Sequence, residues 1–188
     1  MRVKYILLAL ALMINLSTLQ SNEKNKHILI VYGSFSGSTK EIVDSMKTYL
    51  TANSMFVDIM PAEKNKIDIS KYDKIIIGSA IHGNAPHPKV MDFIEINRVE
   101  LNTKRIAVFV VCGTITSSKK SKRDIALTFP DKVANGLKTI DKTVFAGNMP
   151  SNGKKFEDFM GKMILGIVPG DYRDWGKIKK WAIDVSKK

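Results

Sequence analysis

The stretch "VYGSFSGSTKEIVDSM", residues 31–46, joins an apolar segment to an amphipathic one through a run of small residues. "HILIVY" at 27–32 predicts a buried strand, and "TKEIVDSMKTYL" at 39–50 carries apolar residues at helical spacing. A helix that starts after such a turn presents unpaired backbone N–H groups at the positive end of its dipole. The turn adds hydroxyl groups as further donors, from Ser34, Ser36, Ser38 and Thr39. The stretch therefore predicts a strand, a phosphate-binding loop and a helix.

Four more apolar runs predict strands at 55–60, 74–80, 105–113 and 142–147. Those at 27–32, 74–80 and 105–113 are almost continuously apolar, as expected for central strands of a parallel sheet that helices cover on both faces. Helical patterns fall between the strands and after the last one, at 86–97, at 121–140 with a break near Pro130, and at 174–188. Alternating strands and helices predict a three-layer α/β domain over residues 27–188.

Two connections depart from this alternation. Residues 61–72, "PAEKNKIDISKY", carry no helical stripe, so one covering helix is expected to be reduced there. In the segment 148–175 a helical stripe of Phe and Met lies beside Lys154, Lys155 and Lys162. Such a stripe usually packs into the core, and this is the interpretation favoured for Phe156 and Ile164. The sequence leaves core packing and contact with a membrane, quinone or partner protein equally open for Phe159, Met160 and Met163.

The N-terminal segment, residues 1–26, has the layout of a secretory signal or a short membrane anchor. Arg2 and Lys4 precede an uncharged run from Tyr5 to Ser21. The pattern for cleavage is poor, and the apolar run is shorter than the roughly 20 residues that span a bilayer. Cleavage and retention as an anchor both remain open, and the segment predicts an exported or membrane-anchored protein.

The net charge and the single cysteine limit the partners and the kinds of site that we expect for this chain. The net charge is +12, and residues 27–188 retain 26 basic and 17 acidic residues, a net charge of +9. Such a surplus favours an anionic partner, which could be a membrane surface, an acidic protein or a carboxylated or phosphorylated small molecule, or it is simply a lysine-rich solvated surface. No nucleic-acid-binding motif accompanies the charge, so nucleic acid is not expected as a partner. The single cysteine, Cys112, excludes an internal disulfide, and no metal site is expected.

The phosphate-loop stretch resembles the phosphate loop of flavodoxins, with Tyr32, Ser34, Gly37 and Thr39 at matching positions. It lacks the ending of a nucleoside-triphosphate loop and the glycine spacing of a dinucleotide fingerprint. Residues 72–94, "YDKIIIGSAIHGNAPHPKVMDFI", are similar to the third strand and following loop of flavodoxin-type protoporphyrinogen oxidases. The C-terminal "GDYRDWGKIKKWA" is similar to the end of those proteins. The resemblance covers residues 27–183.

The resemblance implies a flavodoxin-like three-layer sandwich with a five-stranded parallel sheet in the order 2-1-3-4-5. It implies FMN as the cofactor, at the carboxyl ends of the strands near the switch in strand order. The expected FMN phosphate loop comprises Ser34, Phe35, Ser36, Gly37, Ser38 and Thr39. Ala80, Ile81, His82 and Gly83 are expected to line one side of the flavin ring. Cys112, Gly113, Thr114 and Ile115 are expected to line the other side.

Two positions in this implied site carry alternatives of their own. His82 is the ring-bearing side chain of the third-strand loop, and stacking on flavin and exposure to solvent both remain open for it. His87, between Pro86 and Pro88, is expected simply to start a helix.

The implied function is that of an FMN-dependent oxidoreductase, with protoporphyrinogen oxidation by a quinone acceptor as one specific form. Two alternatives remain: an electron carrier between protein partners, and an interaction module that has lost its flavin. Since FMN would carry the redox chemistry, bound flavin separates the last of these from the other two.

Overall fold

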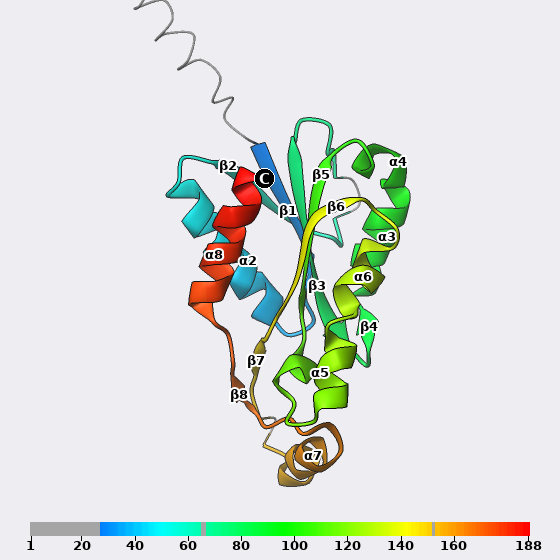
Figure 1. Ribbon diagram of the computed structural model, residues 1–188, viewed down its shortest axis with the longest axis vertical. Coiled ribbons are helices and arrows are strands. Elements are labelled where there is room, and N and C mark those ends of the chain that lie inside the picture. The colour runs from blue at the N-terminus through cyan, green and yellow to red at the C-terminus, as the bar shows by residue number, and fades with distance from the viewer. Residues whose placement is uncertain (1–26, 65–66, 152) are drawn as a thin grey trace, which may run out of the picture.

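The computed structural model describes residues 27–64, 67–151 and 153–188, so the predicted signal or anchor at 1–26 lies outside it. Five strands form a parallel sheet in the order β2-β1-β3-β5-β6 (Figure 1). Their bounds are β1 His27–Gly33, β2 Phe56–Pro61, β3 Lys74–His82, β5 Arg105–Val111 and β6 Thr139–Phe145. Counted as parallel strands only, this is the predicted order 2-1-3-4-5, and the predicted flavodoxin-like α/β fold is confirmed.

One short strand extends the sheet beyond the prediction. β4, Ala85–Pro86, pairs antiparallel with the end of β3, with Ile81 opposite Pro86 and His82 opposite Ala85. The two residues of the turn, Gly83 and Asn84, both have positive φ, at 56° and 63°. A two-residue turn of this kind matches the twist of the strands that it joins. The third-strand loop is therefore a tight hairpin.

One face of the sheet is covered by two helices that are far apart in the sequence. α2, Ser38–Thr51, and α8, Trp175–Lys187, lie side by side on this face (Figure 1). Their buried side chains pack on inward-facing residues of β1, β3 and β5. Asp174 is the N-cap residue of α8, and its carboxylate accepts a hydrogen bond from the Lys177 N–H at 2.9 Å.

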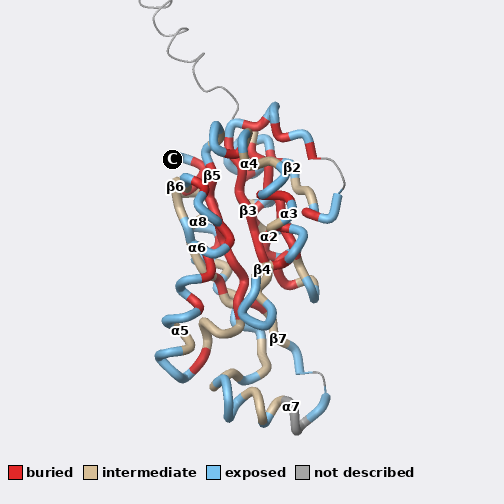
Figure 2. Tube along the Cα trace, turned by 90° about the vertical axis from the view of Figure 1, so that its right-hand side faces the viewer, coloured by how far each residue is buried: buried red, intermediate tan, exposed pale blue. Residues whose placement is uncertain are grey.

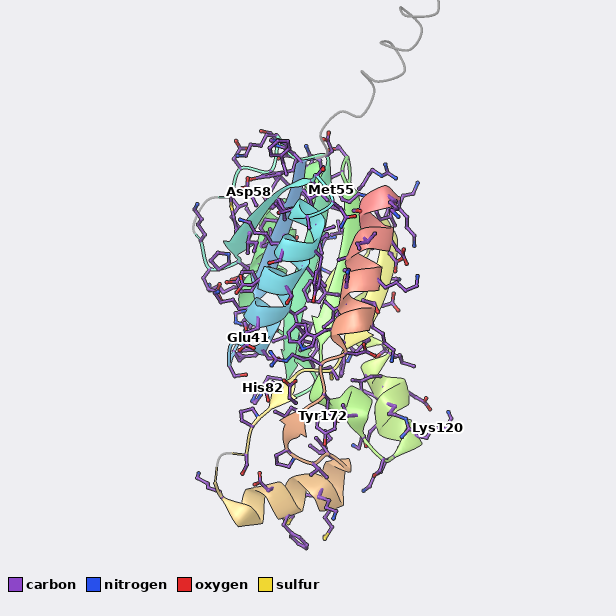
Figure 3. All side chains as sticks on the ribbon, turned by 90° about the vertical axis from the view of Figure 1, so that its left-hand side faces the viewer. Glu41, Met55, Asp58, His82, Lys120 and Tyr172 are labelled. Atoms are coloured by element: carbon purple, nitrogen blue, oxygen red, sulfur yellow. The ribbon has the colours of Figure 1, made fainter. Side chains whose placement is uncertain are left out.

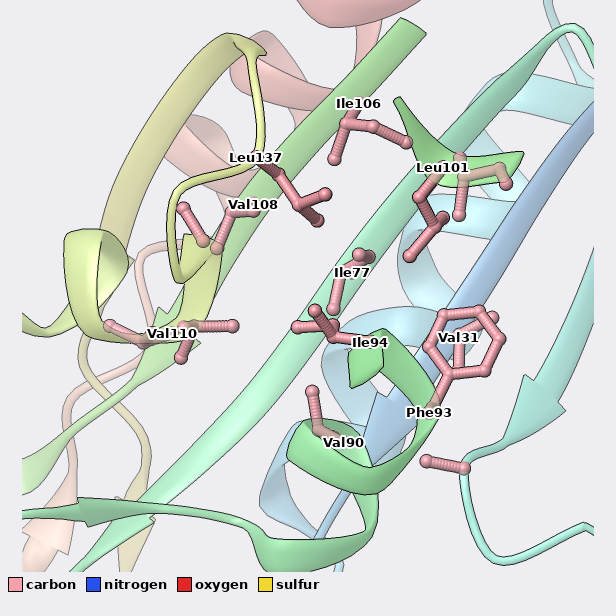
Figure 4. Close-up of a cluster of buried hydrophobic side chains, with 14 of the residues drawn as sticks. Val31, Ile77, Val90, Phe93, Ile94, Leu101, Ile106, Val108, Val110 and Leu137 are labelled. Atoms are coloured by element: carbon pink, nitrogen blue, oxygen red, sulfur yellow. The ribbon is translucent and has the colours of Figure 1, made fainter. Parts of the chain in front are cut away.

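The opposite face carries shorter helices. These are α3 Pro88–Ile96, α4 Arg98–Leu101, α5 Lys120–Ala126 and α6 Phe129–Ala134. Figure 4 shows Val90, Phe93 and Ile94 of α3 against Val31 and Ile77 of the sheet, all of them buried. The predicted helix at 121–140 is divided in two, and Pro130 occupies the first turn of α6, where a missing N–H costs nothing.

The predicted loss of a covering helix between β2 and β3 is confirmed for the described residues of that connection. Ala62, Ile67, Ile69 and Tyr72 are buried there and fill part of the face that a helix would cover. Burial is continuous along the central strands and decreases toward α7, Lys155–Met160 (Figure 2).

The segment after β6 projects from one end of the domain. β7, Asn148–Met149, pairs antiparallel with β8, Gly170–Asp171, so the chain between them leaves and returns at the same place. That excursion contains α7 and the π-helical turn η2, Gly161–Leu165 (Figure 1). Hydrogen bonds attach η2 to the loop before α5, since the Ser118 N–H donates to the Gly166 carbonyl at 3.0 Å.

Core packing is the wrong interpretation for much of the stripe in this segment. Ile164 was expected in the core and is 52% exposed, while Phe159 and Met163 are 57% and 58% exposed. The pattern of apolar residues is helical, but α7 and η2 extend past the end of the sheet, so among the described residues no second layer faces them (Figure 2). The prediction for the Phe156 side chain lies outside the described side chains.

Candidate functional site

The loop between β1 and α2 begins the site. The Ser34 hydroxyl accepts a hydrogen bond from the Gly37 N–H at 3.1 Å, which closes a small turn and leaves the hydroxyl proton available as a donor. Gly37 is the N-cap residue of α2 with φ of +91°, a left-handed conformation that glycine adopts without strain. A Cβ placed on Gly37 would have no heavy atom within 4 Å, so the loop is open on that side.

Ser38 and Thr39 follow at the first turn of α2, and both are buried. The Ser38 hydroxyl accepts a hydrogen bond from the Asn148 N–H at 2.9 Å, which attaches β7 to the start of α2. Ser38 therefore makes a tertiary contact. Local sequence patterns do not predict it, because Ser38 and Asn148 are far apart along the chain. α2 has 14 residues, long enough to present a developed dipole at this end.

The hairpin after β3 lies beside this loop. β1 and β3 are neighbours, with Gly33 opposite Ser79, so the loops that follow them leave from adjacent positions. Ala80 and Ile81 are partly buried, and Ile81 packs against the core, whereas His82 and Gly83 are exposed. The predicted residues of this hairpin are thus beside the loop after β1, at the point where the strand order reverses.

Three aromatic rings connect the loop to the hairpin. The Phe35 ring lies 4.5 Å from the His87 ring and 5.5 Å from the His82 ring, measured between centroids. Phe35 is 52% exposed and His87 is 7% exposed. Phe35 belongs to the predicted phosphate loop, and its contact with His87 could not be predicted because nothing local in the sequence joins these residues.

The fourth parallel strand, β5, contributes the next loop. Cys112 follows β5 with its side chain in the core, so only its backbone faces the strand end. Gly113 and Thr114 belong to a short 3₁₀ helix, η1 Gly113–Thr116, in which Ile115 is partly buried. A Cβ on Gly113 would lie 2.3 Å from the Met149 sulfur, so glycine permits β7 to approach.

Arg173 ties the C-terminal motif to the start of α2. Its guanidinium forms ion pairs with Glu41 in the first turn of α2 and with Asp171, and it lies 4.7 Å from the centre of the Trp175 ring. The hydrogen bond with Asp171 is the largest cause that raises the pKa of Arg173, and the same bond lowers the pKa of Asp171. The resemblance drew attention to this motif, but its contact with α2 appears only in the structure.

Figure 3 shows His82 and Tyr172 at the end of the domain nearer α7, and Met55 and Asp58 at the opposite end. The predicted residues after β1, β3 and β5 therefore gather at the carboxyl ends of the strands. A hollow of about 430 Å³ lies between the β2–β3 connection and α3 and includes Glu63, Lys89 and Phe93.

These observations test whether the residues present fit an FMN group. The open glycine turn and the helix N-terminus suit a phosphate, and the partly exposed rings of Phe35 and His82 suit the planar part of a flavin. The residues fit. The individual contacts to FMN stay predictions.

The fold and this site define an α/β protein with a ligand-binding crevice at the β1/β3 switch point. The chain belongs to the flavodoxin domain family, whose model matches residues 29–164. That membership supports FMN as the cofactor.

Solved flavodoxin structures share this fold. Oxidised flavodoxin 1 from Bacillus cereus aligns with a TM-score of 0.58 and 17% identity, covering 86% of this chain and 98% of that one. Flavodoxin 2 from the same organism gives 0.56 and 22%, with the same coverage. Fusobacterium nucleatum flavodoxin bound to flavin mononucleotide gives 0.50 and 12%, again covering 86% and 98%. No curated protein sequence matches the chain.

Proposed function

We propose that the protein binds FMN at the switch point and transfers electrons at a membrane surface, with a quinone as acceptor. Bound FMN supplies the electron-transfer chemistry. The loop after β1 would hold the phosphate through backbone N–H groups and the Ser34 hydroxyl. The Phe35 and His82 rings would flank the cofactor and limit the access of water.

The observation that carries the membrane part of this proposal is the surface formed by α7, η2 and the residues just after them. We call it the tip surface, and its exposed apolar side chains are Phe159, Met163, Ile164, Leu165 and Val168. A continuous group of such side chains on a soluble domain marks a contact site. Lys154 and Lys162 flank it, as expected for a surface that meets anionic lipid.

The tip surface is also held in a defined position relative to the rest of the domain. The Lys119 ammonium donates hydrogen bonds to the carbonyls of Met163 and Ile164, at 2.8 and 3.0 Å. The Ser117 hydroxyl donates to the Leu165 carbonyl. These bonds fix η2 to the β5–α5 loop, at the end of the domain where the strands meet the proposed cofactor. An apolar acceptor dissolved in the membrane would then approach from the cofactor side.

Delivery to the membrane is assigned in this proposal to residues 1–26. Fusing those residues to a reporter should move the reporter out of the bacterial cytosol. Recovery of all the reporter in the soluble cytosolic fraction would contradict this part. In the described part of the chain, no helix is both long and apolar enough to cross a membrane.

Protoporphyrinogen, a substrate with anionic carboxylates, is one specific form of the proposal, and the positive net charge of residues 27–188 supports a substrate of that charge. The second candidate function is electron transfer between protein partners without a separate substrate. The shared fold of the flavodoxin structures favours that candidate.

The test begins with the full chain purified from its native host and the identification of its extracted cofactor. Reduced protein is then mixed with anionic vesicles that contain a quinone, with matched vesicles that lack it, and with a soluble protein acceptor. Oxidation of the flavin that depends on the vesicle quinone supports the proposal. Bound FMN with oxidation by the protein acceptor alone would favour the carrier, and absence of flavin would reject both.

A further inference from the structure

His87 is the most unusual polar side chain in the described part of the chain. It is 7% exposed, and its Nδ1 atom is buried without a hydrogen-bond partner. Leaving a buried polar atom unpaired is destabilising. An atom in this state at a ligand crevice therefore calls for a functional explanation.

The position of His87 is set by the two strands at the switch point. Its backbone N–H donates to the Ser79 hydroxyl at 2.9 Å, and Ser79 lies opposite Gly33 in the sheet. A Cβ on Gly33 would lie 2.6 Å from both Cγ and Nδ1 of His87. Since Phe35 also stacks on this ring, His87 contacts the residues on both sides of Ser34. The imidazole thus lies directly behind the first half of the phosphate loop.

The loop has no cation of its own to balance an anion. Residues 33–39 contain neither lysine nor arginine, and the ammonium of the next residue, Lys40, pairs with Asp44 at 2.7 Å. Helix N-termini stabilise anions, but the effect amounts to partial charges. His87 is the titratable side chain packed against the loop on its inner side.

A carboxylate and several other titratable groups surround His87. On its outer side, Nε2 lies 3.5 Å from the Glu63 carboxylate. His82 lies beyond the Phe35 ring, and Lys89 and Asp92, which pair with each other at 3.0 Å, follow His87 on α3. A protonated ring would present Nε2–H to Glu63 and Nδ1–H toward the loop.

We infer that His87 is the proton-holding group of this site. Its imidazolium balances the phosphate charge of FMN from behind the loop, and FMN binding takes up a proton at Nδ1. The charge acts across the thin wall formed by Gly33 and Ser34 and needs no direct contact with the ligand. An anion beside an imidazole favours the protonated form, so the binding of the phosphate and of the proton support each other. The inference rests on the proposed binding of FMN.

The test is calorimetric titration of the FMN-free full chain with FMN in buffers of different ionisation enthalpy, which counts protons taken up on binding. Measurements run from about pH 5 to about pH 8, the range in which histidine changes charge. The wild type should take up more protons than His87→Asn, by up to about one per FMN. His27→Asn is the matched control, because His27 starts β1 at the opposite end of the strands, and it should behave as the wild type.

The same titration with riboflavin, which lacks the phosphate, tests whether the phosphate of FMN causes the proton uptake at His87. With riboflavin the difference between wild type and His87→Asn should disappear. Equal proton uptake by wild type and His87→Asn with FMN would overturn the inference, as would an unchanged difference with riboflavin. If His87→Asn fails to fold, His87→Gln replaces it under the same criteria. A wild type that binds no FMN would instead refute the proposed function, and the two failures are therefore distinguishable.

Discussion

The tip surface gives the most direct test of the proposed membrane contact. In the double variant Phe159→Ala and Met163→Ala, two side chains that are 57% and 58% exposed in the free protein are removed. Burying a whole Phe or Met side chain contributes about 1.5–3 kcal/mol. Since little more than half of each remains to be buried on binding, the loss is about 1–1.5 kcal/mol for each side chain. The double variant should bind anionic vesicles about 30- to 150-fold more weakly.

Vesicle sedimentation of the full chain measures this loss, and urea denaturation measures stability in parallel. Because both side chains are exposed, the variant should lose less than about 0.5 kcal/mol of unfolding free energy. The matched control replaces Ile96 and Val99 by alanine, residues that are 81% and 86% exposed on α3 and just beyond it, away from the tip surface. Equal weakening in both double variants, or unchanged vesicle binding in the first, would refute the assignment. A loss of about 3–5 kcal/mol of stability would show instead that Phe159 is packed in a core.

Three other predictions concern the cofactor loop and the stability of the fold. Replacing Ser34 and Thr39 together by alanine should weaken FMN binding by about 2–4 kcal/mol, through loss of hydrogen bonds to a charged phosphate, and unchanged affinity in fluorescence titration would reject the assigned loop. Lys74 is buried at the start of β3, and its ammonium donates to two carbonyls at the end of α8. Lys74→Met should lower the free energy of unfolding, measured by urea denaturation, by about 2–3 kcal/mol, because the lost hydrogen bonds to a charged donor outweigh the gain from no longer burying a charge. A variant as stable as the wild type would contradict this prediction. A hydrogen bond from Tyr72 at 2.6 Å is the main cause that lowers the pKa of Asp58. The stabilisation of the folded state by this hydrogen bond is present above the ordinary aspartate pKa of about 3.9 and is lost as the pH falls through the lower pKa of the folded state. Tyr72→Phe should therefore destabilise the protein by less than about 1 kcal/mol at neutral pH, since Asp58 is half exposed. The variant should also lose less stability than the wild type on acidification to about pH 2, and an unaltered acid profile would argue against this role of Tyr72.

Local patterns were sufficient to predict the sheet and the loop after β1. Period and apolarity identify each strand, and small residues before an amphipathic segment identify a helix N-terminus, because both signals act within a few residues. The parallel order followed from the family resemblance. The hairpin at Gly83 and Asn84 was missed as a structure, although Gly and Asn are residues that tolerate positive φ.

Long-range contacts could not be predicted in this way. His87 reads as an ordinary helix start between two prolines, and it is buried only because β1 and β3 pair with Gly33 opposite Ser79. The stripe around Phe159 and Ile164 has the same spacing whether it faces a core or a membrane. Its exposure depends on where α7 and η2 lie relative to the sheet, which periodicity does not encode.

The contact between α2 and α8 has a consequence for biosynthesis. α2 presents the loop that we assign to the cofactor, yet the face on which it rests is completed by the last helix, and Arg173 attaches the approach to that helix to Glu41. A ribosome makes the loop before it makes the helix that supports it. We therefore expect nascent chains that end before Gly170 to be released without flavin retention, which a fluorescence assay on truncated translation products would measure. Cofactor capture then becomes a check that synthesis has passed α8.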